Sequence, residues 1–176
     1  MTVSKPREDA STWMSGTYPT QNLKLRQAVV KEGLSKLTET TIEFLSENTG
    51  VNLSEIVGKI MTLHVQAAPG SDESRLFTGT VIEVEAMGMR DGKDHFVAQV
   101  RPWFWMLTLE RNIRVFQEKT VKQIIEEVLS EHGFADYEIK TTETYEAREY
   151  CVQYRETDFD FVSRLMEQEG IYYFFI

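Results

Sequence analysis

The sequence predicts an α+β fold in which a small antiparallel β-barrel is followed by an α/β segment with two helices. Short runs of alternating apolar and polar residues, up to about residue 109, are typical of half-buried strands. After Phe116 the apolar residues recur at the spacing of amphipathic helices. A length of 176 residues, 41% of them hydrophobic, is enough to bury a core without disulfides.

The predicted barrel takes residues 22–112. Ile42 and Phe44, and further on Met61 and Leu63, alternate with polar neighbours and are therefore expected to point into the barrel. Several such runs without a long helix between them favour a small antiparallel barrel or sandwich.

Two short segments within this region predict connections between strands. The Asp91-Gly92 step predicts a tight hairpin turn, since both residue types tolerate positive φ. Residues 53–57 follow Asn52 and are predicted to form a single helical turn.

Two helices are predicted from their capping residues. Thr120 and Gln123 have the spacing of a capping box, and Gly133 marks the end of the first helix. Thr157 is the predicted N-cap of the second helix, which ends at Gly170. The expected core faces are Val121, Ile124, Ile125, Val128 and Leu129 in the first helix, and Phe161, Val162, Leu165 and Met166 in the second.

The two ends of the chain lead to different expectations. Residues 1–21 have no apolar period, so we predict a flexible N-terminal arm with Trp13 and Tyr18 as possible anchors. Residues 171–176 are uncharged, aromatic and typical of a strand. We expect this strand to pair with residues beyond the sequence, so that residues 113–176 are the start of a truncated α/β subdomain.

The composition excludes several classes of function. With 28 acidic and 19 basic side chains, the formal charge of −9 repels phosphate backbones, and we predict no nucleic-acid partner. The single cysteine, Cys151, excludes an internal disulfide and suits a reducing compartment. The first twenty residues lack the apolar core of a secretory signal, and no segment of the sequence has the roughly 18 consecutive apolar residues of a membrane-spanning helix.

No catalytic residue, metal site, cofactor or small-molecule substrate is predicted. An alternative hypothesis is that Asp158 and Asp160 form a carboxylate pair that binds a divalent cation in an enzyme. Their place in the first turn of a helix favours a structural role, because carboxylates there oppose the positive end of the helix dipole. Cys151 has no nearby base in sequence and is expected to be a buried, inert thiol.

Residues 148–175 resemble the VgrG family, the spike proteins of type VI secretion systems, and the resemblance extends over residues 23–176. The family-motif residues, to which we assign packing and capping roles, are Cys151, Gln153, Tyr154, Glu156, Thr157, Asp158, Phe161, Arg164, Leu165 and Gly170.

The resemblance implies a domain like the tail hub of contractile phages. Residues 22–112 would be the first tube-type barrel of a homotrimeric hub that docks on the tube protein Hcp, and residues 113–176 the start of the α/β hub subdomain. Baseplate proteins would also bind this hub, while effectors and a PAAR-repeat tip would attach through later parts of the protein.

The function so implied is to transmit contraction force and deliver effectors, without enzymatic activity. The protein would assemble in the bacterial cytoplasm and leave through the apparatus without a signal peptide. The hub of a contractile phage or phage-like particle is the alternative within the same fold, and a metal-dependent enzyme that uses Asp158 and Asp160 is the alternative outside it.

Overall fold

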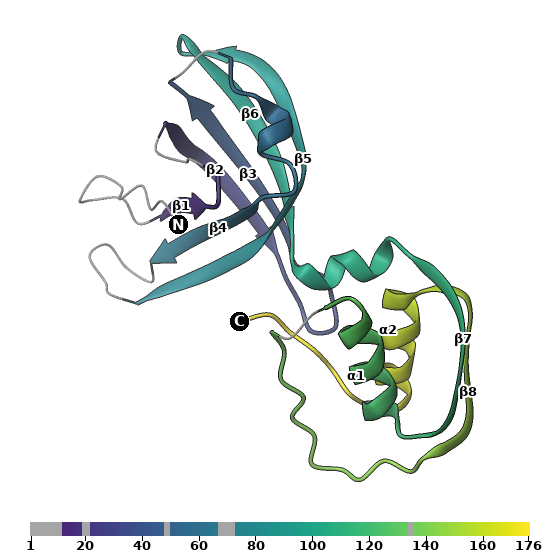
Figure 1. The fold of residues 1–176 in the computed structure, drawn as a ribbon. Helices are drawn as coiled ribbons and strands as arrows, with labels where there is room; N and C mark the ends of the chain where they lie inside the picture. Colours follow the sequence, from purple (N-terminus) through teal and green to yellow (C-terminus); the bar gives the residue numbers. More distant parts are fainter. Residues whose placement is uncertain (1–11, 19–21, 48–49, 67–72, 134–135) are drawn as a thin grey trace. The chain divides into compact units, whose positions relative to one another are not determined.

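The computed structural model describes residues 12–18, 22–47, 50–66, 73–133 and 136–176 (Figure 1). The chain divides into two compact units. Unit 1 runs to Trp103 and includes Phe175–Ile176, and unit 2 is Phe104–Phe174. The division lies before the boundary at residue 113 that we predicted.

Unit 1 is one antiparallel sheet with the strand order β1-β4-β5-β6-β3-β2. The strands curl around a common interior in the manner of a half-barrel (Figure 1), and β1 and β2 are the two edges. Mostly antiparallel structure with few helices is thus confirmed, whereas the strand order leaves the sheet open. The bounds are β1 (Thr12–Gly16), β2 (Leu23–Lys31), β3 (Glu39–Ser46), β4 (Ile60–Gln66), β5 (Ser74–Arg90) and β6 (Lys93–Arg101).

The core of unit 1 follows the predicted alternation. Ile42 and Phe44 of β3 are completely buried, and Met61 and Leu63 of β4 are nearly so. Phe44 packs against Phe96 of β6, with ring centroids 5.5 Å apart. Period-2 patterning therefore identified the inward face of these strands correctly.

Both predicted connections are confirmed. Asp91 and Gly92, with φ of 51° and 74°, form the turn between β5 and β6, and Arg90 pairs with Lys93 across it. The short helix η1 (Leu53–Glu55) is capped by Asn52, whose side chain accepts a hydrogen bond from the Ser54 N–H.

Part of the predicted flexible arm is instead a strand. Thr12–Gly16 form β1 and pair with β4. Trp13 stacks on His64 with ring centroids 4.7 Å apart, and Ser15 Oγ lies 2.7 Å from His64 Nε2. Burial lowers the pKa of His64. Pairing with a distant strand thus orders a segment that has no apolar period of its own; residues 1–11 and 19–21 lie outside the described residues.

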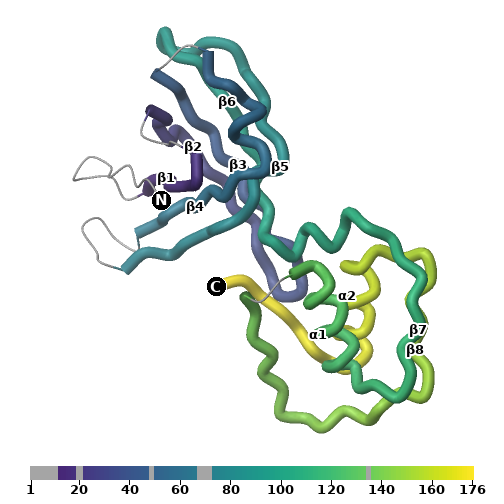
Figure 2. Tube along the Cα trace, in the orientation of Figure 1, coloured from purple at the N-terminus to yellow at the C-terminus, as the bar shows by residue number. Residues whose placement is uncertain are grey.

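Unit 2 packs two helices against one face of a two-stranded antiparallel sheet (Figure 1). Phe116 of the sheet stacks on Phe161 of the second helix, with centroids 5.5 Å apart. Residues 136–147, in the long connection from the first helix to the second strand, form neither helix nor strand (Figure 2). The bounds are η2 (Trp103–Thr108), β7 (Arg111–Lys119), α1 (Val121–Glu131), β8 (Arg148–Thr157) and α2 (Asp158–Gln168).

The predicted helix ends and core faces are confirmed. Thr120 and Gln123 form both bonds of the capping box of α1. Thr157 accepts a hydrogen bond from the Asp160 N–H at 3.0 Å and so caps α2. All the residues predicted for the two core faces are buried.

The expected strand at residues 171–176 is not a strand in the structure. Tyr173 packs edge-on against Phe104 at 4.9 Å, whereas Tyr172 and Phe174 are 61% and 59% exposed. A strand needs a hydrogen-bonded neighbouring strand, and within the described residues these six positions belong to neither sheet.

In the described part of the chain, none of the helices is long and apolar enough to cross a membrane.

Gly170 ends α2 with φ of +69°, in the arrangement of a Schellman motif. The Gly170 N–H donates to the Glu167 carbonyl, and the Ile171 N–H donates to the Met166 carbonyl at 2.8 Å. A Cβ added at Gly170 meets no atom within 4 Å, so substitution strains only the backbone.

We therefore expect Gly170→Val to lower the free energy of unfolding by roughly 1–2 kcal/mol. Gly170→Asn should cost less, since Asn tolerates the left-handed region. Urea unfolding of the three proteins checks this, and equal stability of the Val variant and the original would rule out the capping role.

Candidate functional site

The most buried charge in unit 2 is the carboxylate of Asp158, the first residue of α2. Its side chain has no exposed surface. Its backbone N–H donates to the Glu110 carbonyl at 3.3 Å, just before β7. The Thr157 cap begins the helix at this point and so places Asp158 in the layer between the helices and the sheet.

Four side chains contact the buried carboxylate and are named here, with Asp158, the Asp158 cluster. Asn112 Nδ2 and Gln153 Nε2 donate to Oδ1 at 3.0 and 2.7 Å. Arg114 donates to Oδ2 at 3.2 Å, and His132 Nε2 lies 2.7 Å from the same oxygen. Both carboxylate oxygens are thus satisfied, which is what a buried charge requires.

The cluster keeps Asp158 ionised. Burial by itself would raise the pKa of Asp158, but the hydrogen bonds from Asn112, Gln153 and His132 and the charge of Arg114 outweigh burial and lower it. The negative charge also lies at the N-terminal end of α2, where the helix dipole favours it.

Further bonds tie the cluster to both strands and both α-helices of unit 2. Gln153 also donates to the Glu156 carbonyl at 3.2 Å, and Arg114 pairs with Glu131 of α1 at 2.7 Å. Arg164 of α2 reaches back to Glu156 of β8 with two hydrogen bonds, of 3.2 and 2.6 Å. The arrangement therefore holds β7, α1, β8 and α2 together through charged groups.

The same place contains a set of possible metal ligands. Within the described residues, Glu110, His132 and Asp158 offer ligand atoms that all lie within 4.8 Å of one another. The Arg114 guanidinium on the same Asp158 oxygen would repel a divalent cation, so the donor set suits an ionic hydrogen-bond cluster better than a metal cage. Asp160 is exposed and is not one of these three residues.

The other family-motif residues fall into a buried group and a surface group. Cys151, Gln153, Phe161 and Leu165 are buried between the sheet and the helices. Tyr154 is 62% exposed on the opposite side of β8.

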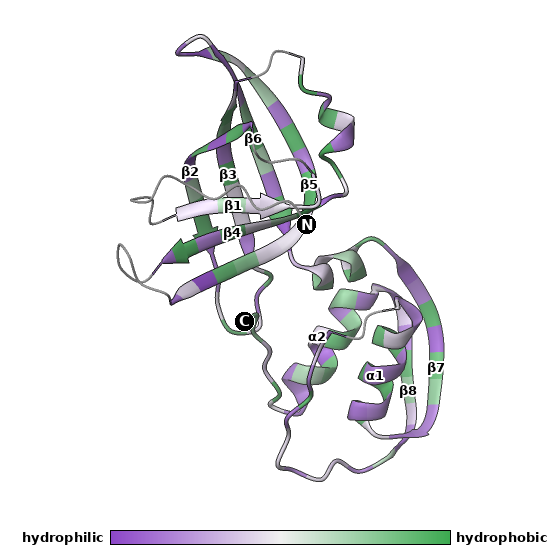
Figure 3. Ribbon diagram, turned by 60° about the vertical axis from the view of Figure 1, so that its left-hand side comes forward, coloured by the Kyte–Doolittle hydropathy of each residue, from purple (hydrophilic) through white to green (hydrophobic). Residues whose placement is uncertain are grey.

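Tyr154 belongs to an exposed apolar surface, the outer face of the β7–β8 sheet. Ile113 pairs with Tyr154 and Val115 with Val152, so these side chains lie side by side on the strands. Figure 3 shows apolar positions alternating along β7. The outer face comprises Ile113, Val115, Tyr150, Val152 and Tyr154, which are 44–62% exposed. Contiguous exposed apolar residues of this kind mark surfaces that other molecules cover.

Sequence reasoning did not find the cluster partners Asn112, Arg114 and His132. These three residues are 46, 44 and 26 positions from Asp158 in the sequence. For example, Asn112 comes near Asp158 because the β7–β8 register places it opposite Glu156. The sequence shows that Asp158 is the first residue of a helix, but it does not show which side chains donate hydrogen bonds to it.

Three comparisons with known proteins agree on the kind of protein. The sequence profile of the phage tail baseplate hub (GPD) family matches residues 31–176. The type VI secretion system spike proteins VgrG1a and VgrG1c of Pseudomonas aeruginosa are 41% and 40% identical over 153 residues. These alignments cover 87% of this chain but only 24% and 21% of the relatives, so the chain spans about a quarter of their length.

The solved structures share the fold. The E. coli c3393 protein, described as a component of the type VI secretion system, superposes with a TM-score of 0.64 at 24% identity, over 82% of this chain and 42% of that one. The 43 kDa tail protein of prophage MuSo2 from Shewanella oneidensis gives a TM-score of 0.55 at 14% identity, over 90% of this chain and 50% of that one.

Asp158 and Asp160 provide a matched pair of substitutions. Asp158→Asn removes a buried charge while Arg114 and His132 remain, and we expect it to cost roughly 3 kcal/mol of unfolding free energy. Asp160→Asn removes only an exposed charge at the helix terminus and should cost about 0.3–1 kcal/mol. Urea unfolding measures both values, and equal losses would show that the cluster does not stabilise unit 2.

The lowered pKa of Asp158 also predicts a pH dependence. A carboxyl whose pKa is lower in the folded state contributes fully above its unfolded value, close to the ordinary 3.8, and loses that contribution as the pH falls through the folded pKa. The stability difference between the original protein and Asp158→Asn should therefore be constant near neutral pH and shrink below about pH 4. A difference that persists unchanged in stronger acid would contradict the assignment.

Proposed function

Because the chain belongs to the phage tail baseplate hub (GPD) family, we propose that it works as part of the hub and spike of a type VI secretion system. The identity of about 40% to spike proteins over 87% of the chain carries this proposal and favours secretion over a phage particle. Residues 22–112, which include the sheet of unit 1, would serve as the first tube-type barrel, and residues 113–176 as the start of the α/β hub subdomain.

The proposed mechanism is mechanical. The curled sheet of unit 1 would contribute to a trimeric hub that docks on the tube protein Hcp and passes contraction force to the spike. Force transmission needs rigid units and large subunit interfaces. The Asp158 cluster supplies the rigidity of unit 2, since both oxygens of its buried carboxylate are held by donors from three other segments.

The outer face of β7–β8 supplies a surface for a subunit interface. Val152 pairs with Val115 in the middle of this face and Tyr154 pairs with Ile113 at one end, and the two β8 side chains are 44% and 62% exposed. Exposed apolar residues side by side are typical of a surface that a partner covers. We assign this face to contact with neighbouring subunits or baseplate proteins of the assembled apparatus. Effectors and a PAAR-repeat tip would be carried by later segments, and the protein would be assembled in the cytoplasm and exported through the apparatus.

The proposal includes no bond chemistry for this chain. An actin cross-linking toxin of Vibrio cholerae, VgrG1, is 44% identical, but over only 70 residues, which are 6% of that protein. The shared part is too small to carry the activity in that name, and the buried groups of unit 2 are used in holding its elements together.

A substitution in the outer face tests the proposal. Val152→Asp places a charge where a neighbour would bury it, and we expect the release of Hcp from cells to fall by about tenfold or more. Leu109→Asp is the matched control, because Leu109 is 57% exposed in unit 2 and lies outside β7 and β8, and Hcp release should be unchanged. The melting temperature of both variants should stay near that of the original. Normal Hcp release by a stable Val152→Asp protein would refute the assigned role of this face.

A further inference from the structure

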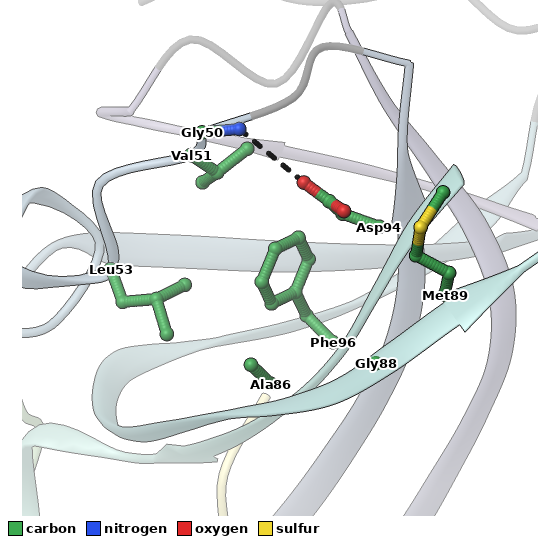
Figure 4. A pocket seen from close by; sticks show the side chains of 8 residues that line it. All are labelled: Gly50, Val51, Leu53, Ala86, Gly88, Met89, Asp94 and Phe96. Carbon is green, nitrogen blue, oxygen red and sulfur yellow. Dashed lines mark hydrogen bonds between the residues drawn. The ribbon is translucent and has the colours of Figure 1, made fainter. Parts of the chain in front are cut away.

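A small pocket in unit 1 lies between the η1 connection and the β5–β6 hairpin. Its volume is about 270 Å³. Val51 and Leu53 form one wall, and Phe96 of β6 stands between Leu53 and the hairpin (Figure 4). Pockets that hold cofactors or substrates are usually 300–1,000 Å³, so this one has room for about one large side chain.

One carboxylate is placed at the end of these apolar walls. Asp94 accepts a hydrogen bond from the Gly50 N–H at 3.4 Å, and Figure 4 shows its carboxylate directed toward Gly50 beside Val51. The neighbouring cation, Lys93, is bound to Glu47 at 2.9 Å. Within the described residues no ion pair is found for Asp94, and its carboxylate therefore retains acceptor capacity toward an occupant.

The occupant must combine an apolar body with a cationic, hydrogen-bonding end. An arginine side chain has this form, since its stem packs on apolar walls while its planar guanidinium donates two parallel N–H groups to a carboxylate. Arginine is also more weakly hydrated than lysine and packs on aromatic rings such as Phe96. The net charge of −9 favours a basic partner as well.

We propose that this pocket receives an arginine side chain presented by another protein chain, with the stem against Leu53 and Phe96 and the guanidinium on Asp94. The pocket would then select among partner chains, because a neutral or acidic residue in place of the arginine leaves Asp94 without a cationic partner. The inference goes beyond the hub role and does not rest on it.

The probe is N-acetylarginine amide, titrated into the ¹⁵N-labelled chain and followed by NMR. Saturable shifts are expected at the amides of Gly50, Asp94 and Phe96. N-acetylcitrulline amide, the neutral isostere, should bind about tenfold more weakly, the effect of one charge-assisted hydrogen-bond pair.

Two substitutions separate the pocket from general charge attraction. Asp94→Asn should abolish the shifts, whereas Asp91→Asn removes the same charge from the hairpin tip, where Asn tolerates positive φ, and should leave binding intact. Ala86→Leu should fill the pocket and block the probe without a change of charge. Equal binding of arginine and citrulline, retained binding by a folded Asp94→Asn protein, or shifts that do not saturate would each overturn the proposal.

Discussion

Unit 2 depends on keeping one buried carboxylate ionised. Asp158 has no exposed side-chain surface, and an unpaired charge in that position would cost several kcal/mol. Its donors come from β7, β8 and the end of α1, so the charge is tolerated only when all these elements are in place. This requirement links a local feature, the start of α2, to the arrangement of the whole unit, and it explains why polar residues occupy positions between the sheet and the helices.

In the same arrangement, the apolar residues of β7 and β8 lie on both faces of the two-stranded sheet. Phe116 and Cys151 face the helices and are buried, while Val115 and Val152 point the other way and are exposed. An isolated two-stranded sheet is marginally stable and needs packing against other elements, here the two helices. The cluster stabilises it from the covered side, which leaves the outer face available for a neighbour. Rigidity and docking surface therefore come from opposite faces of the same two strands.

Local signals predicted the helices and turns well. Thr120, Thr157 and Gly170 act on residues within one turn, so their effects are readable from the sequence. Strand β1 was not predicted, because it is ordered by pairing with β4 and by the stacking of Trp13 on a residue far along the chain. Asn112, Arg114 and His132 were missed as cluster members for the same reason: their proximity follows from strand register and helix packing. Alternation identified the inner face of the sheet, but whether a sheet closes depends on its edges.

The central claim is that neighbours cover the outer face of β7–β8 in an assembled hub. Oxidative footprinting of Tyr150 and Tyr154 tests it most directly, since both side chains are more than 60% exposed in the isolated chain. The account predicts strong labelling of both tyrosines in the free protein and marked protection of both in the assembled apparatus. Equal labelling of Tyr150 and Tyr154 in the two states would contradict it.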